Sequence, residues 1–270
     1  MKIIFFVINY KADIYLNKFI NSINLSKNGI NVKVDIHVID NSQKDHVEFK
    51  IFKKEYLKSG VSIHSNGKNV GYFGAIPIAQ KVLQGVETDC VIYCNPDLQV
   101  DVNFFAELIK SKDINGIIAP AIISEGEGID QNPKYIERIP ISKMKRLEYI
   151  YSNIVSHSLF FSLAKLKEII EQIIGKQSVQ LKNETIYASH GAMFIFNNVF
   201  FFKKLKPYPC FLFGEEIFIA EEAKKSDTLI FYKPKIKVYD VRHASISLLS
   251  NKIKRDLYYK SINFLLKEYY

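Results

Sequence analysis

Two short acidic stretches hold the side chains best suited to chemistry. Asn95-Pro96-Asp97 follows an apolar run at 91–94, and Glu215-Glu216 follows Gly214. A carboxylate at the end of a buried strand lies at the sheet edge where open α/β proteins bind ligands, so Asp97 suits a metal or phosphate site. A carboxylate in the first turn of a helix is held rigidly and could take a proton from an attacking hydroxyl.

Each stretch also has an ordinary structural interpretation. Asp97 could cap a helix near 102–110. Acidic residues are common in the first helical turn because they complement the helix dipole, and we prefer that interpretation for Glu221-Glu222. For Asp97 and Glu215-Glu216 the choice depends on the elements around them.

Strands and helices alternate through the first hundred residues. Apolar runs predict strands, and apolar residues at helical spacing predict helices. The alternation predicts a parallel sheet with right-handed crossovers. Strands are expected at 2–8, within 32–42, at 61–65, 91–94 and 115–123, and helices at 13–27, 47–58 and 75–86.

Polar residues follow the ends of four successive strands, at Asn9, Asp40, Asn69 and Asp97. In a doubly wound sheet these positions converge on one crevice. Gly71 would also let the backbone approach a ligand closely. Taken singly, each position is explained at least as well by a turn or a cap, but four in succession favour a nucleotide site.

Seven motifs in chain order resemble the landmarks of family 2 glycosyltransferases with a GT-A fold. They are VINY, VIDNS, NVGYFG, CNPD, HGAMFIF at 190–196, FLFGEEIFIAEEAKK at 211–225 and VRHASIS at 241–247. The resemblance implies an α/β fold: a Rossmann-like, mostly parallel central sheet flanked by helices, with helical acceptor-side and C-terminal elements. It implies one domain, 1–250, with a nucleotide-binding half at 1–100. The acceptor half, 101–250, would carry a helical insertion at about 143–175.

The resemblance also implies roles on the donor side. Asp40 would hold the base or ribose, Asn69 and Gly71 would lie against the nucleotide, and Gly191-Ala192 would lie near the donor sugar. Asn9 and Asn95 complete the implied nucleotide-sugar site. Ile76-Pro77-Ile78 departs from many relatives, which carry small residues and Asn there.

The resemblance also implies which residues bind the metal and which residue acts as the general base. Asp97 would bind a divalent cation, Mg or Mn, and His243 would reach that cation or the diphosphate. Asn95 stands where the family's DxD motif has its first acid, which predicts weaker metal binding. Glu215-Glu216 matches the family's Glu-Asp pair, with Glu216 in the place of the base.

Composition adds limits on location and partners. Three cysteines without ligand-like pairing favour a reduced, cytoplasmic setting. No run of about 18 apolar residues is present. The net charge of +9 suits an acidic partner. The basic amphipathic segment 251–270 could lie on an anionic membrane, at the inner face of the plasma membrane, or support an oligomer, or cover the core.

The leading hypothesis is an inverting hexosyl- or deoxyhexosyl-transferase. Its donor would be a nucleotide-diphosphate sugar, and its acceptor a glycan or lipid-linked glycan of a bacterial surface polysaccharide, such as lipopolysaccharide or capsule. A nucleotidyltransferase of nucleotide-sugar synthesis is an alternative, although no glycine-rich loop follows the first strand. A catalytically degenerate, transferase-like binding protein is another. Nucleic acid is not expected as a partner because the basic residues are spread along the chain.

Overall fold

The computed structural model describes residues 1–42, 60–65, 67–158, 160, 184–241 and 249–270. The helix expected at 47–58, the second half of the insertion at 143–175, and His243 lie outside the described residues.

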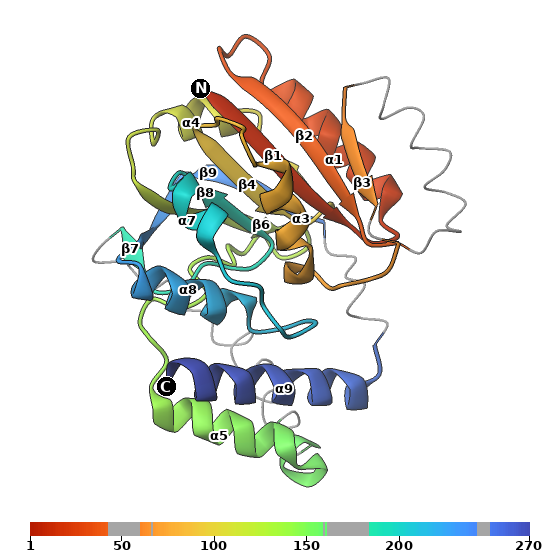
Figure 1. Cartoon of the computed structure of the whole chain (residues 1–270), viewed down its shortest axis with the longest axis vertical. Coiled ribbons are helices and arrows are strands. Elements are labelled where there is room, and N and C mark those ends of the chain that lie inside the picture. The colour runs from red at the N-terminus through yellow and green to blue at the C-terminus, as the bar shows by residue number, and fades with distance from the viewer. Residues whose placement is uncertain (43–59, 66, 159, 161–183, 242–248) are drawn as a thin grey trace.

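A central sheet runs through the molecule in the order β3-β2-β1-β4-β8-β6-β9-β5, and β7 pairs with β9 (Figure 1). The first four strands in this order are mutually parallel, as the alternation predicts. β8 then runs antiparallel to both β4 and β6. The strands are β1 (Lys2–Asn9), β2 (Lys33–Asp40), β3 (Ser62–Ser65), β4 (Cys90–Cys94), β5 (Leu98–Val100), β6 (Gly116–Ser124), β7 (Thr185–Ile186), β8 (Met193–Phe196) and β9 (Leu229–Asp240).

Helices cover both faces of the sheet. The helix expected at 75–86 is split into the 3-10 turn η1 (Phe73–Ala75) and α3, which ends at Val82. Pro77 is tolerated in α3 because it lies in the first turn. The helices are α1 (Asp13–Ser26), α3 (Ile76–Val82), α4 (Phe104–Ile109), α5 (Ile141–Ser152), α7 (Val199–Lys204), α8 (Glu215–Lys225) and α9 (Asn251–Tyr269).

The core lies on both faces of the sheet because strand side chains alternate. Along β1, Phe5 packs edge-on against Phe19 of α1, with ring centroids 6.1 Å apart. Phe6 points to the other face and stacks on Phe202 of α7. β1 is therefore buried on both sides, which explains its continuous apolar sequence.

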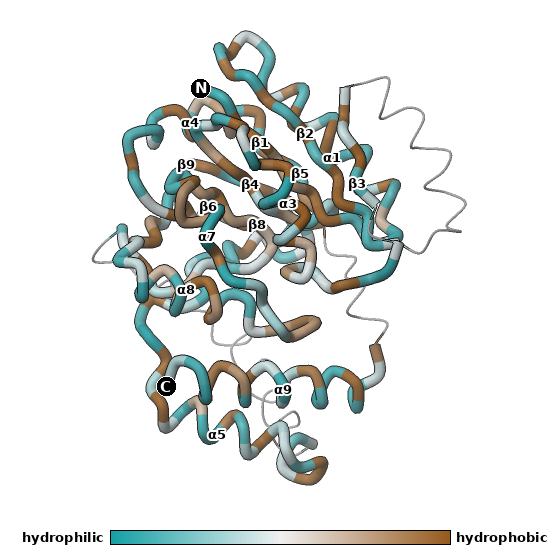
Figure 2. The backbone as a smooth tube through the Cα atoms, in the orientation of Figure 1, coloured by the Kyte–Doolittle hydropathy of each residue, from teal (hydrophilic) through white to brown (hydrophobic). Residues whose placement is uncertain are grey.

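α5 and α9 pack side by side beyond α8, on the side away from the sheet (Figure 1). Apolar and polar residues alternate along α9 (Figure 2), and its buried residues are Ser261, Ile262 and Leu265. Among the described helices, none combines the length and apolar character needed to cross a membrane.

The C-terminal end of α9 is fastened to α8. Arg138 forms an ion pair with Glu221, at 2.7 Å between Nε and Oε1, and donates to the backbone oxygen of Tyr269. The hydroxyl of Tyr269 donates to Glu222 at 2.9 Å. Glu221 and Glu222 therefore join α8 to its neighbours, in agreement with a structural rather than catalytic interpretation of this pair.

Candidate active site

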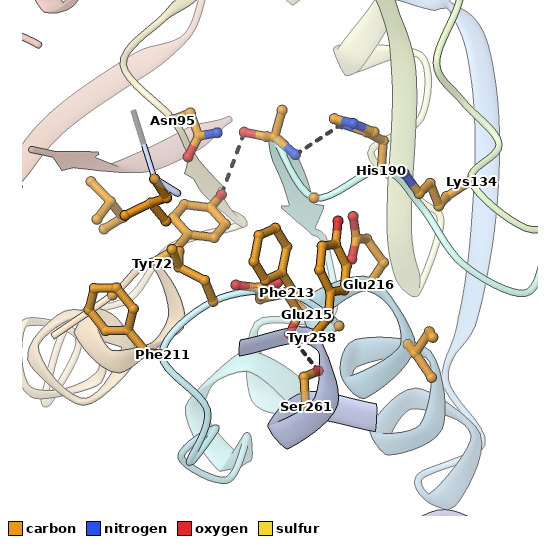
Figure 3. A pocket seen from close by; sticks show the side chains of 18 of the residues that line it. Tyr72, Asn95, Lys134, His190, Phe211, Phe213, Glu215, Glu216, Tyr258 and Ser261 are labelled. Atoms are coloured by element: carbon orange, nitrogen blue, oxygen red, sulfur yellow. Dashed lines mark hydrogen bonds between the residues drawn. The ribbon is translucent and has the colours of Figure 1, made fainter. Parts of the chain in front are cut away.

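A cavity of about 770 Å³ lies between the carboxyl ends of β1 and β4 and the layer formed by α8, α5 and α9 (Figure 3). This is the edge of the sheet at which the strand-end residues were expected to meet. Most of the sequence-predicted site residues line it: Asn69, Gly71, Asn95, Asp97, Gly191, Ala192, Glu215 and Glu216.

Asn9 and Asp40 do not line the cavity. Both are buried at the ends of β1 and β2, where Asn9 Nδ2 donates to Asp13 Oδ1 at 2.9 Å. The Asp40 carboxylate accepts from the backbone N–H of Ser42 at 3.0 Å. These contacts turn both side chains toward the protein, so they brace the strand ends behind the cavity wall.

Asn41 lines the cavity beside this cluster, and sequence reasoning missed it. Its Nδ2 donates to the backbone oxygen of Gly71 at 2.9 Å. Its Oδ1 is buried and accepts no hydrogen bond from the described residues. The signal was its position directly after Asp40 at a strand end.

The turn at Asn69–Gly71 is held by its own side chain. Asn69 Oδ1 accepts from the backbone N–H of Gly71 at 3.0 Å. Gly71 has a φ of 80°, and a Cβ there would lie 2.1 Å from the backbone oxygen of Phe211. The glycine is therefore needed for the close approach of the 211 loop as well as for the turn.

The Asn95–Asp97 turn is tied to two neighbouring strands. The N–H of Asn95 donates to the backbone oxygen of Ala192 at 2.9 Å, and the N–H of Val241 donates to that of Asp97 at 3.1 Å. Strand β5 follows directly, and α4 begins only at Phe104 after its N-cap Asn103. The alternative in which Asp97 caps the next helix is therefore wrong.

The donor set of this turn suits a hard divalent cation that shares its coordination with a bound phosphate. Asp97 and Asn95 offer a carboxylate and an amide oxygen on one wall of the cavity. Magnesium is commonly held by one or two carboxylates together with substrate phosphates and water. The described residues contain no cluster of three or more His, Cys, Asp or Glu side chains that could bind a metal by themselves.

The wall opposite the sheet carries the two glutamates. α8 begins at Glu215, directly after Gly214, as expected. A Cβ on Gly191 would lie 3.4 Å from Oε1 of Glu216, so this carboxylate packs against Gly191. In Figure 3 the Glu216 side chain points to the side of the cavity that His190 occupies, whereas Glu215 turns toward Phe213.

The surroundings of Glu215 change its protonation. Glu215 is buried, and this burial, with a smaller contribution from neighbouring Glu216, raises the pKa of Glu215 to about 8. Backbone amides of Glu215 and Phe213 counteract part of the rise. At neutral pH Glu215 therefore holds its proton and is a poor candidate for the base, whereas the Glu216 side chain is partly exposed on the cavity wall.

Several lining residues come from segments that local patterns did not connect with the site. Lys134 places a cationic side chain on the cavity wall. His190 Nδ1 accepts from the N–H of Ala192 at 3.2 Å, which shapes the Gly191 turn. Tyr258 and Ser261 of α9 reach the cavity from the C-terminal segment. Only His190 had a sequence signal, since it opens the HGAMFIF motif.

No family model and no curated protein matches the chain. Solved structures do match it, and the three described below match at 10–18% identity, which shows the fold alone. GalNAc-T7 with UDP, GalNAc and Mn²⁺ gives a TM-score of 0.57 and 18% identity over 91% of this chain, which spans 44% of that protein. Residues 1–349 of S. aureus TarS in complex with UDP-GlcNAc give a TM-score of 0.56 and 10% identity, and the match covers 99% of this chain and 73% of that one.

A third match is the mannosyltransferase PcManGT from Pyrobaculum calidifontis in complex with GDP-Man and Mn²⁺, with a TM-score of 0.53. Its identity is 11% over 98% of this chain and 70% of that one. The strand order, the strand-end cavity and these matches agree: the chain has the GT-A fold, the fold of glycosyltransferases that use nucleotide sugars.

Proposed function

We propose that this protein is a glycosyltransferase that moves a sugar from a nucleotide-diphosphate sugar to an acceptor hydroxyl with inversion at the anomeric carbon. One observation carries the proposal. The strand-end turn Asn95–Asp97 and the side chain of Glu216 line a single cavity. A group suited to the donor's diphosphate and a group suited to take the acceptor's proton can therefore act on one bound donor.

The donor would lie along the strand ends. The nucleotide would contact Asn69, Gly71 and Asn41, and its diphosphate would extend to Asp97. Asp97 and Asn95, with His243, would hold a magnesium or manganese ion against the diphosphate. Such a cation offsets negative charge on the leaving phosphate. Mn²⁺ accompanies the nucleotide or nucleotide sugar in two of the matching structures.

The transfer itself is a single displacement. The acceptor oxygen forms a bond to the anomeric carbon while the bond from that carbon to the diphosphate oxygen breaks. The electron pair of the broken bond leaves with the nucleoside diphosphate. The hydroxyl proton passes to Glu216, which therefore acts as the general base. Glu215, protonated at neutral pH, supports the loop.

The acceptor would lie in the cavity beside Glu216. We propose a glycan or lipid-linked glycan of a bacterial surface polysaccharide, and a hexosyl or deoxyhexosyl donor sugar. We also propose a cytoplasmic protein that lies on the inner face of the plasma membrane. The support is the free thiols Cys90, Cys94 and Cys210 together with the basic residues of α9.

The experiment has two stages. A thermal-shift panel of nucleoside diphosphates, with and without Mg²⁺ or Mn²⁺, identifies the base, because a ligand of the folded state raises the melting temperature. Release of nucleoside diphosphate from the matching sugar donors then measures turnover. Stabilisation without any turnover would indicate the catalytically degenerate binding protein, and release of pyrophosphate from a nucleoside triphosphate would indicate a nucleotidyltransferase.

The variants Glu216→Gln and Glu215→Gln form a matched pair. We expect Glu216→Gln to keep donor affinity and to slow turnover by roughly 10²–10⁴-fold, the usual span for loss of a general base. Glu215→Gln should keep turnover within about tenfold of the unchanged protein, because the side chain at position 215 is already neutral in the unchanged protein. If Glu215→Gln is the inactive variant, the assignment of the base is reversed.

A further inference from the structure

Two consecutive residues before the glutamate pair adopt left-handed backbone conformations. Phe213 has a φ of 69° and Gly214 a φ of 79°. Glycine adopts this region freely, but for a bulky residue such as Phe213 it is an outlier. Backbone strain of this kind persists only where surrounding contacts over-determine the conformation. Surrounding contacts must therefore hold Phe213 in this conformation.

The carbonyl of Phe213 is held by two buried hydroxyls from different segments. Tyr208 OH donates to it at 2.6 Å and Ser261 Oγ of α9 at 2.8 Å. The two hydroxyl oxygens lie 2.7 Å apart. Each hydroxyl has one proton to donate, so only two of these three close contacts can be hydrogen bonds at any moment. Whichever two they are, at least one of the hydroxyls donates to the carbonyl of Phe213.

The ring of Phe213 is held as well. It stacks on Tyr258 of α9 with ring centroids 3.7 Å apart and planes 14° apart. Tyr258 stacks in turn on Tyr151 of α5, at 4.8 Å and 25°. The three rings form a column that joins the 213 loop to both helices of the outer layer.

Gly214 interlocks with the same helix. A Cβ at Gly214 would lie 2.2 Å from Ser261 Oγ, so the loop and α9 are in direct contact there. The N–H of Phe218 donates to the backbone oxygen of Gly214 at 2.9 Å, which is the first hydrogen bond of α8. The direction in which α8 starts, and with it the direction of Glu215 and Glu216, follows from the conformation of these two residues.

We propose that Tyr208, Tyr258 and Ser261 are positioning residues that orient the Glu216 carboxylate by holding Phe213–Gly214 in the left-handed conformation. This inference rests on the proposed function for its kinetic consequence, but its structural consequence is independent of it.

The kinetic test compares variants of Tyr258. Tyr258→Phe keeps the aromatic ring and should retain kcat within about twofold. Tyr258→Leu removes the middle ring of the stack and should lower kcat at least tenfold, with the donor KM little changed. The double variant Tyr208→Phe/Ser261→Ala removes both hydroxyls and should behave like Tyr258→Leu. Tyr259→Leu, a partly buried neighbour on α9, is the matched control.

Action through Glu216 is tested by combination. If Tyr258 acts only by orienting that carboxylate, Tyr258→Leu combined with Glu216→Gln should be no slower than Glu216→Gln alone. Fully additive losses would show that Tyr258 affects the reaction by another route. A loss of kcat in Tyr258→Leu no larger than that in Tyr259→Leu would also overturn the proposal.

Hydrogen exchange of the peptide spanning 209–217 provides a readout without turnover. Tyr258→Leu and the double variant should exchange faster there, while Tyr259→Leu and Tyr258→Phe should match the unchanged protein. Unchanged exchange in both test variants would refute the positioning role. If the unchanged protein turns over no donor, the proposed function fails, and the exchange data still decide whether these residues hold the loop.

Discussion

Replacing Glu215 by glutamine should stabilise the protein, and increasingly so as the pH rises. Glu215 has a pKa of about 8 in the folded chain against a reference value of 4.5, and burial is the main cause. A folded-state pKa that is raised means that the native state keeps its proton while the unfolded state releases it. The stability of the unchanged protein therefore falls between about pH 4.5 and pH 8, by about 1.4 kcal/mol per pH unit.

The size of the effect follows from the width of that window. About 3.5 pH units separate the two pKa values, which sets an upper limit of about 5 kcal/mol on the difference in stability, and we expect a gain of a few kcal/mol. Glutamine is neutral at all these pH values and similar in shape. The free energy of unfolding of Glu215→Gln should therefore match that of the unchanged protein near pH 4.5 and exceed it by this amount at pH 8 and above.

Urea unfolding at several pH values between 4.5 and 9 measures this difference directly. Glu87→Gln, at an exposed position, is the control and should show no such trend. A stability difference between Glu215→Gln and the unchanged protein that does not vary with pH would refute the reasoning. In that case Glu215 would be ionised in the folded state, and its exclusion as the general base would lose its support.

Three further predictions concern the ligands and the outer helix. Asp97→Ala should abolish the metal-dependent part of nucleoside diphosphate binding in calorimetric titration, and undiminished affinity would remove Asp97 from the metal site. Asp40→Asn should lower the melting temperature and leave diphosphate affinity nearly unchanged, because its carboxylate faces Ser42; an affinity loss of about 1–3 kcal/mol would instead indicate direct contact with the nucleoside. Changing the exposed lysines of α9 to glutamine should reduce retention on anionic liposomes at low salt, and equal retention would exclude α9 as the contact surface. These lysines are Lys252, Lys260 and Lys267.

The half of the fold that local patterns describe could be predicted from the sequence. The continuous apolar run of β1 and the strand-helix alternation specify a parallel sheet, and β3, β2, β1 and β4 form one. Asn95-Pro96-Asp97 and Gly214-Glu215 could be placed because each lies at an abrupt change from apolar to polar sequence. An abrupt change from apolar to polar sequence marks the end of a strand or helix regardless of what that element packs against.

Pairing between distant segments could not be predicted in this way. The sequence of β8 does not reveal that it runs antiparallel between β4 and β6. Helical spacing in α5 and α9 shows that each has an apolar face, but not that the two faces close the cavity. The directions of the Asn9 and Asp40 side chains depend on Asp13 and Ser42, whose contacts appear only once the strand ends are fixed.

The C-terminal helix shows why one segment supported several interpretations. Its buried face presents Tyr258 and Ser261 to the cavity, whereas its three exposed lysines are spaced eight and seven residues apart and so share the opposite, solvent side. Covering the core and contacting an anionic surface are therefore compatible, because they use different faces. Deleting α9 would remove both faces at once and could not separate them. Substitutions can: the lysine variants should lose liposome retention and keep kcat in solution, whereas Tyr258→Leu should lose kcat and keep retention. If the lysine variants also lost kcat in the absence of membrane, the two faces would not act independently.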